Sequence, residues 1–267
     1  MLKKYKQMLL VTFLAIITLA GCSISDQEAD NTSEAESNGE QAEDAGRSGI
    51  LNNIGDIEAD GTAEALKNCE FHSDTQKVAL TFDDGPEPEV TPQILNILSQ
   101  YEARATFYMV GNSVEYYPEI AREVAEEGHE IGNHTMTHAD LTTLPEEEAI
   151  YEIDKTNELI SDAAGQKPTS FRPPYGSTNE SLEELVDMSA VLWTIDSFDW
   201  QSRDAESIIQ VIQEEVHEDA IILMHDIHQE TADALPEVLD YLQSQGYEMI
   251  TVSELLYDTN SNLFISI

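Results

Sequence analysis

At residues 77–86 the sequence reads KVALTFDDGP. The apolar run that opens this stretch is typical of a buried strand, and Gly85-Pro86 indicates that the strand ends in a turn. Asp83 and Asp84 therefore lie at the carboxyl end of a strand. Because side chains alternate along a strand, the chain must bend for both carboxylates to face one site. Two carboxylates this close repel each other unless a cation or a guanidinium separates them; an ordinary acidic turn is the alternative interpretation.

Strands and helices alternate along the rest of the chain. We predict strands at residues 77–80, 105–110, 129–132, 169–172, 190–195, 220–223 and 248–252. We predict helices at residues 91–101, 118–127, 145–164, 180–188, 205–216 and 231–245, and a last helical turn at 253–257. Strands separated by helices imply parallel crossovers. Seven such strands predict an α/β fold close to a (β/α) barrel, in which reactive groups gather at the carboxyl ends of the strands.

The composition is strongly acidic. The 267 residues include 53 Asp and Glu but only 12 Lys and Arg, which gives a formal net charge of −41. A charge of this sign argues against nucleic acid as a partner, because nucleic-acid affinity depends on neutralising phosphates with basic side chains.

Two histidines follow the strand predicted at 129–132. The sequence there reads GNHTMTH, which places His134 and His138 four residues apart. That spacing puts both imidazoles on one face of a helical turn, where they can bind one metal ion with Asp84 as the third ligand. Three protein ligands leave positions open for water, as in catalytic metal sites. A pair of surface or N-capping histidines is the alternative interpretation.

An arginine follows the next predicted strand, in the sequence FRPPYG. Two prolines and a glycine make this turn rigid. Arg172 is one of only five arginines in the chain, so few others can serve in its place. Its guanidinium can pair with Asp83 and keep that carboxylate ionised. An arginine at the rim, in a weak exposed ion pair, is the alternative.

The strands predicted next are also followed by polar side chains. One leads into the sequence IDSFDW, which contains Asp196, Asp199 and Trp200, and another ends in LMHD, which contains His225. If an aspartate of the first group reaches His225, its charge favours the imidazolium, and His225 becomes a proton donor near neutral pH. A packed or capping histidine and a core tryptophan are the alternative interpretations.

Taken in order, these motifs resemble those of the NodB-homology polysaccharide deacetylases, carbohydrate esterase family four, over residues 77–256. The resemblance implies a distorted (β/α) barrel that removes acetyl groups from polysaccharides with a divalent metal. The metal is expected to be zinc, with cobalt as an alternative. The implied metal ligands are Asp84, His134 and His138.

The resemblance also implies catalytic roles. Asp83 is the expected general base, and Arg172 is expected to orient it. The backbone N–H of Tyr175 is expected to stabilise the oxyanion. Asp199 is expected to tune His225, the general acid, although Asp196 is close enough in sequence to leave this pairing open. The implied substrate-binding residues are Trp200, Leu223 and Tyr175.

The first 22 residues resemble a bacterial lipoprotein signal. A lysine-rich start precedes an apolar segment at 8–19 that is too short to span a bilayer comfortably. The sequence LAGC that ends at Cys22 resembles the lipobox. The resemblance implies that residues 1–22 are a lipoprotein signal peptide with its lipobox cysteine. Lipid on Cys22 would anchor the protein at the extracytoplasmic face of the cell membrane. A plain secretory signal with a chance cysteine is the alternative.

Residues 23–62 are rich in Glu, Asp, Ser, Asn and Gly and contain few large apolar residues. Such a segment cannot bury enough apolar surface to offset its ordering entropy, so we expect a disordered acidic tether. Residues 63–267 are the expected polysaccharide deacetylase domain. Cys69 has no assigned function.

A lipid-anchored deacetylase faces the cell wall, so the expected substrate is the N-acetylglucosamine of peptidoglycan. Chitin oligomers, acetylxylan or an exopolysaccharide are alternatives, because the motifs recognise the acetyl group and the metal rather than the sugar chain. A non-catalytic glycan-binding lipoprotein is a third hypothesis, since a fold alone does not fix function. The sequence does not decide between N-acetylglucosamine and N-acetylmuramic acid, and it assigns no role to His228.

Overall fold

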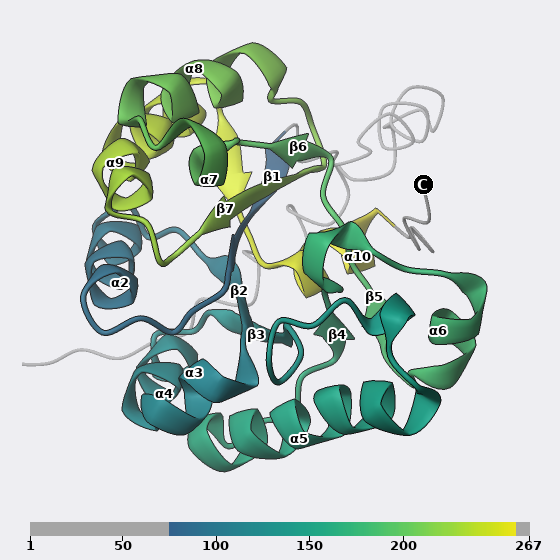
Figure 1. Ribbon diagram of the computed structural model, residues 1–267. Helices are drawn as coiled ribbons and strands as arrows, with labels where there is room; N and C mark the ends of the chain where they lie inside the picture. The colour runs from purple at the N-terminus through teal and green to yellow at the C-terminus, as the bar shows by residue number, and fades with distance from the viewer. Residues whose placement is uncertain (1–74, 260–267) are drawn as a thin grey trace, which may run out of the picture. The chain divides into compact units, whose positions relative to one another are not determined.

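The computed structural model describes residues 75–259 (Figure 1). The signal peptide and lipobox predicted for 1–22, the tether predicted for 23–62, and Cys69 lie outside the described residues. Within 75–259, none of the helices combines the length and the apolar composition needed to cross a bilayer.

The described residues contain one parallel sheet of eight strands. In chain order the strands are β1 (Gln76–Asp83), β2 (Ala105–Met109), β3 (Glu130–Asn133), β4 (Ser170–Phe171), β5 (Ser189–Ala190), β6 (Ile195–Asp196), β7 (Ala220–His225) and β8 (Tyr247–Met249). Their order in the sheet is β5-β4-β3-β2-β1-β7-β6, and β8 pairs with the first residues of β1. The fold class predicted from the alternation of strands and helices, an α/β distorted barrel, is confirmed.

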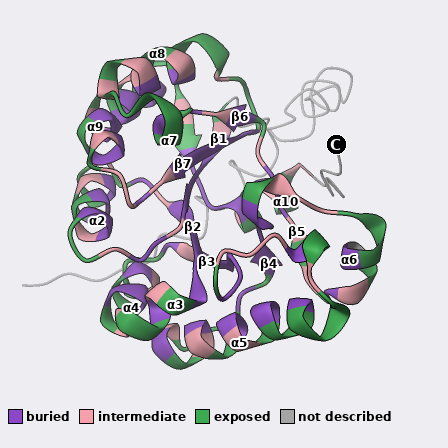
Figure 2. Cartoon of the chain, in the orientation of Figure 1, coloured by how far each residue is buried: buried purple, intermediate pink, exposed green. Residues whose placement is uncertain are grey.

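Helices occupy the connections and surround the curled sheet (Figure 1). They are α2 (Val90–Gln100), α3 (Gly111–Tyr116), α4 (Pro118–Glu126), α5 (Glu146–Ala164), α6 (Glu180–Leu185), α7 (Asp199–Ser202), α8 (Ala205–Glu215), α9 (Gln229–Ser244) and α10 (Val252–Asp258), with short 3-10 turns η1 (Leu141–Thr143) and η2 (Pro174–Gly176). Figure 2 shows the strands almost wholly buried, whereas the helices bury one side and expose the other. This is the pattern expected of amphipathic helices packed on a sheet.

Alternation along β1 decides which side chains face the inside of the barrel. Val78, Leu80 and Phe82 belong to the large core beneath the helices. Ala79 belongs to a separate inner cluster. Because successive side chains of a strand point to opposite faces, Thr81 and Asp83 share the inner face with Ala79. The sequence of β1 therefore places a carboxylate inside the barrel at its carboxyl end.

The single strand predicted at 190–195 is wrong, and the structure has the two short strands β5 and β6 in its place. β5 pairs with β4, while β6 pairs with β7 on the opposite edge of the sheet. The chain crosses between these edges: Val191 N–H still donates to Phe171 O, whereas Thr194 N–H already donates to Ile221 O. A segment that changes its neighbouring strand within four residues cannot form one continuous ladder of hydrogen bonds. The sheet therefore stays open between its two edges, β5 and β6.

The amino end of the barrel is closed by α10. Val252 and Leu255 of this helix pack into the inner cluster with Ala79, Tyr108 and Ile221. The helix begins with a capping box, in which Thr251 and Glu254 each bond to the other's backbone N–H. This end of the barrel is therefore filled with side chains, and the open end is the one where the strands finish.

Candidate active site

The polar residues that follow the strands meet at the carboxyl end of the sheet, around a pocket of about 430 Å³. Residues from β1, β6, β7 and α7 and from the segments after β1, β3, β4 and β5 all contribute to it, although they are far apart in sequence. The lining residues are Asp83, Asp84, His134, His138, Pro173, Tyr175, Trp193, Asp196, Trp200, Leu223 and His225.

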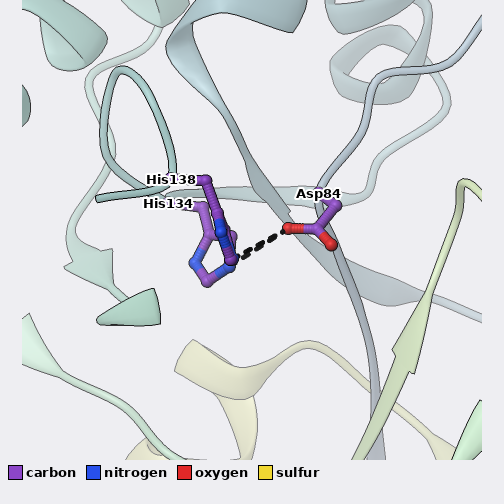
Figure 3. A group of neighbouring side chains, drawn as sticks. All are labelled: Asp84, His134 and His138. Carbon is purple, nitrogen blue, oxygen red and sulfur yellow. Dashed lines mark ion pairs between the residues drawn. The ribbon is translucent and has the colours of Figure 1, made fainter. Parts of the chain in front are cut away.

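Three of these residues form a compact group of possible metal ligands (Figure 3). The Oδ1 atom of Asp84 lies 3.5 Å from Nε2 of His134 and 3.3 Å from Nε2 of His138. One ligand atom from each residue lies within 4.8 Å of the other two. The bend that aims Asp84 at the histidines is visible in its backbone, because Asp84 has a φ of 78°.

The chemistry of these groups fits a divalent cation. Asp84 Oδ1 is buried and has no hydrogen-bond partner among the described residues. Burial favours the neutral acid, but the neighbouring rings of His134 and His138 outweigh it and lower the pKa of Asp84 to about 2. Burial also lowers the pKa of His138, which favours the neutral imidazole that binds metals. One carboxylate and two imidazoles match the ligands of catalytic zinc sites.

A hydrogen bond to the other ring nitrogen orients His134. Its Nδ1 atom lies 2.7 Å from the carbonyl oxygen of Arg172. A carbonyl only accepts, so Nδ1 carries the proton and Nε2 presents its lone pair towards Asp84. A backbone carbonyl on the far nitrogen is the usual way in which proteins fix a metal-binding histidine.

The helical turn predicted for His134 and His138 is wrong. The segment between them has no regular structure, and Thr135 and His138 have left-handed backbone, with φ of 65° and 57°. Asn133 at the end of β3 accepts a hydrogen bond from Thr135 N–H and so interrupts a helical path. The two imidazoles converge through this loop rather than through helical spacing; their centroids are 5.0 Å apart.

Asp83 forms a buried ion pair with Arg172. Nη1 of Arg172 donates to Asp83 Oδ1 over 2.8 Å, and the side chains of Arg172 and Asp83 are 0% and 4% exposed, respectively. The same guanidinium donates to Thr81 Oγ1 and to the carbonyls of Val191 and Leu192. Its carbon lies 4.2 Å from the centre of the Tyr108 ring. Arg172 is therefore not the rim arginine of the alternative interpretation, and it ties the open side of the sheet to β1.

His225 pairs with Asp199. Its Nδ1 lies 2.8 Å from Asp199 Oδ1, and its backbone N–H donates to Asp199 Oδ2. Burial opposes the charged imidazole, but Asp199 outweighs it, with help from the charges of Asp83 and Asp84, and raises the pKa of His225 to about 9. Asp196 does not take part in this pair: its carboxylate accepts from Phe198 N–H and from the indole N–H of Trp200.

The remaining walls of the pocket are aromatic or apolar. Leu223 is buried, whereas Trp200 is 49% exposed and is therefore not a core tryptophan. Tyr175 packs edge-on against His138, with ring centroids 4.8 Å apart. The left-handed backbone of Tyr175, at φ 62°, follows from the tight turn after Pro173-Pro174. Among the described residues no group accepts a hydrogen bond from Tyr175 N–H.

Sequence comparison shows the family. A model of the family described as polysaccharide deacetylase matches residues 72–190. A peptidoglycan-N-acetylglucosamine deacetylase from Bacillus cereus is 38% identical over 187 residues, which cover 67% of this chain and 87% of that protein. The chain belongs to the polysaccharide deacetylase family.

Two further comparisons place the chain within the polysaccharide deacetylase family. The peptidoglycan-N-acetylmuramic acid deacetylase PdaC of Bacillus subtilis is 42% identical over 178 residues, which cover 67% of this chain but only 38% of PdaC. A structure of PdaC superposes with a TM-score of 0.69 at 40% identity and covers 70% of this chain and 93% of the solved one. The chain thus corresponds to about two fifths of the full length of PdaC, the part that carries the barrel.

Several residues of this deacetylase-like site were not predicted from the sequence. Trp193 lines the pocket from the crossing segment, which was predicted to be strand. Asp226 is fully buried and accepts hydrogen bonds from Gly85 N–H and Thr91 Oγ1. A Cβ on Gly85 would lie 2.1 Å from Asp226, so only glycine fits beside this carboxylate. Asp226 directly follows His225 at the end of β7, and this position in the sequence could have identified it.

Proposed function

We propose that the protein is a metal-dependent N-deacetylase of a cell-surface polysaccharide, and that N-acetylglucosamine residues of peptidoglycan are its substrate. The observation that carries the proposal is the pocket, in which a buried carboxylate paired with an arginine, a group of possible metal ligands and a histidine paired with an aspartate converge from separate strands. The Bacillus cereus relative, named a peptidoglycan-N-acetylglucosamine deacetylase, supports the choice of substrate.

Asp84, His134 and His138 are the residues that hold the metal, with zinc as the expected ion and cobalt as the alternative. Bound there, a divalent cation supplies a Lewis acid that polarises the acetyl carbonyl and lowers the pKa of a coordinated water. The acetamide of the substrate then lies in the pocket between the three metal ligands and His225.

Asp83 acts as the general base. Its Oδ1 is occupied by Arg172, which leaves Oδ2, 3.7 Å from His134 Nε2, free to take the proton of the attacking water. The water oxygen adds to the acetyl carbon, and the carbonyl oxygen becomes an oxyanion. The N–H of Tyr175 is the donor available to stabilise this charge.

His225 acts as the general acid. Asp199 occupies Nδ1, so Nε2 carries the second proton of the imidazolium and faces the pocket. The C–N bond breaks as this proton passes to the leaving nitrogen, which gives acetate and a free amine. Leu223 and Trp200 form the apolar wall for the acetyl methyl group.

The proposal is tested by acetate release from peptidoglycan and from chitin oligomers. Wild type is expected to release acetate from peptidoglycan, a chelator is expected to abolish this activity, and zinc or cobalt is expected to restore it. The Asp83→Asn variant binds metal but releases acetate at a rate lower by roughly 10²–10⁴-fold. Acetate from chitin oligomers, acetylxylan or an exopolysaccharide alone would move the substrate to that polymer. Metal binding with no acetate from any polymer would favour a glycan-binding lipoprotein.

We also propose that Cys22 carries a lipid that holds the protein at the extracytoplasmic face of the cell membrane. The lysine-rich start, the short apolar segment and the LAGC sequence support this. In cells supplied with a labelled fatty acid, the wild-type chain is expected to take up label and the Cys22→Ser variant to take up none. Equal labelling, or wild-type protein free in the medium, would overturn the proposal.

A further inference from the structure

The loop from His134 to His138 needs outside support. It has no regular hydrogen bonding of its own, and Thr135 and His138 both have left-handed backbone. The hydroxyl of Thr135 is buried and has no partner among the described residues. Residues in sparsely populated conformations persist only where the surrounding structure holds them. The groups that hold this loop therefore decide where the two imidazoles lie.

The first half of the loop is held by several contacts. His134 N–H donates to Met109 O, and His134 Nδ1 donates to Arg172 O. Thr135 N–H donates to the side chain of Asn133, which in turn donates to Ile153 O and to Asn157 in α5. His134 is thus fixed both through its ring and through its backbone.

The second half is held differently. The side chain of His138 is 30% exposed, and among the described residues the only carboxylate within 4 Å of its ring nitrogens is that of Asp84. Support for His138 comes from the residue before it. Thr137 donates to Glu152 twice, from N–H to Oε2 over 2.8 Å and from Oγ1 to Oε1 over 2.8 Å. Glu152 is only 8% exposed and projects from α5, the long helix beside the loop.

We infer that Glu152 is a positioning residue for the metal site, and that its carboxylate sets the place of His138 by clamping Thr137. Both carboxylate oxygens are committed to this one residue, so Glu152 fixes the backbone direction just before the ligand. Without the clamp, the loop can relax its left-handed turn and move His138 away from Asp84. Residues that orient metal ligands from behind change metal affinity by about 10–100-fold when they are removed.

The experiment measures zinc affinity of the full chain by competition with a chromophoric chelator. Glu152→Ala is expected to bind zinc about 10–100-fold more weakly than wild type. Glu152→Gln is expected to restore most of the affinity, because its amide oxygen accepts from Thr137 N–H and its NH₂ donates to Thr137 Oγ1. The matched control is Asp154→Ala, which removes the same charge from an exposed position of the same helix. It is expected to bind as wild type does.

The cobalt spectrum gives a second readout. The visible bands of the cobalt-loaded protein report the ligand set, so Glu152→Ala is expected to change them while Glu152→Gln and Asp154→Ala leave them unchanged. Wild-type zinc affinity in Glu152→Ala, or equal losses in Glu152→Ala and Asp154→Ala, would overturn the inference. If Glu152→Ala does not fold, Thr137→Val removes one of the two hydrogen bonds at constant shape. A weaker zinc affinity is then expected, and an unchanged one would overturn the inference.

The inference rests on the metal site of the proposed function, but the two can fail separately. Wild type that binds no zinc would refute the metal site and the role of Glu152 together. Wild type that binds zinc and releases no acetate would refute the deacetylase and leave the affinity comparison intact.

Discussion

One end of the barrel holds the buried His129 and the other the mostly buried His225, and the two histidines have opposite charge states near neutral pH. His129 precedes β3 at the amino end, where its Nδ1 accepts a hydrogen bond from Ala105 N–H. Burial, with the charge of Arg104, lowers the pKa of His129 to about 4. His225 ends β7 at the other end, and Asp199 raises its pKa to about 9 despite burial. Burial is common to both, so the partner of each ring decides whether it is charged.

The two ends also hold arginine–carboxylate pairs, and these differ in burial. The side chains of Arg104 and Glu254 at the amino end are 43% and 39% exposed. Those of Arg172 and Asp83 at the carboxyl end are 0% and 4% exposed. An exposed pair is screened by water and contributes little, whereas a buried pair is costly to break. The carboxyl end is therefore arranged to keep charges in defined states, whereas the amino end only closes the barrel.

The largest expected effect comes from replacing each histidine with asparagine, which keeps a polar atom near Nδ1 but cannot carry the proton. His225→Asn is expected to lower the rate of acetate release by roughly 10²–10⁴-fold, because the leaving amine loses its proton donor. His129→Asn is expected to leave turnover unchanged. Initial rates of acetate release and thermal melting curves of both variants check this.

Melting curves keep this comparison free of folding effects. His225→Asn is expected to remain folded while it loses activity, and His129→Asn is expected to lose stability while it keeps turnover. Equal turnover in the two variants would show that the assignment of chemistry to the carboxyl end is wrong.

The second effect concerns the two arginines. Arg172→Met leaves Asp83 as a buried charge without a partner, and we expect a loss of about 3–5 kcal/mol in the free energy of unfolding. Arg104→Met breaks an exposed pair and is expected to cost less than about 1 kcal/mol. Urea unfolding of both variants measures the difference. Similar costs at the two sites would mean that burial does not separate the pairs.

Sequence was sufficient for those parts of the molecule that depend on short-range patterns. Alternation along β1 puts Asp83 inside the barrel, and parallel strands bring their carboxyl ends together, so residues after separate strands could be expected to meet. Asp84, His134 and His138 come together as this rule predicts, although the helical spacing from which we expected the two histidines to share one face is absent. The fold class was predictable because strands and helices alternate along the sequence, which implies parallel crossovers.

The two local structures that the sequence predicted wrongly are both determined by long-range contacts. The helical reading of the His134–His138 spacing failed because Asn133 and Glu152, which shape that loop, contact it from a strand and a helix. The single strand predicted at 190–195 was wrong because the carbonyls of Val191 and Leu192, in its middle, accept hydrogen bonds from Arg172 instead of from a neighbouring strand. No local pattern records partners that are brought together only by the folded barrel.

The third prediction uses the pH dependence of stability. The pKa of His129 is 6.5 in the unfolded chain and about 4 in the folded one. Its contribution to stability is therefore lost as the pH falls from 6.5 to about 4. The pKa of His225 is 6.5 in the unfolded chain and about 9 in the folded one. Its contribution to stability is therefore lost as the pH rises from 6.5 to about 9. Each slope is at most about 1.4 kcal/mol per pH unit.

Urea unfolding across both pH ranges measures these slopes. The difference in unfolding free energy between wild type and each asparagine variant is compared, because the contributions of the many carboxylates cancel in that difference. His129→Asn is expected to remove an acid-side slope and His225→Asn an alkaline-side slope. Slopes in the same window would contradict the opposite pKa shifts.

The smallest expected effect lies at the amino end, in the ion pair between Lys77 Nζ and Asp258 Oδ2, which are 2.5 Å apart. Both side chains are partly exposed, so Lys77→Ala is expected to cost less than about 1 kcal/mol of unfolding free energy and to leave acetate release unchanged. Glu248 and Glu254 also raise the pKa of Lys77, after the contribution of Asp258, so part of its effect is a diffuse attraction in a very acidic protein. Salt distinguishes the two, because screening removes the diffuse part first. A cost that persists in high salt and matches that of Arg172→Met would show that the amino end holds its charges as firmly as the carboxyl end, and the contrast between the two ends would then be lost.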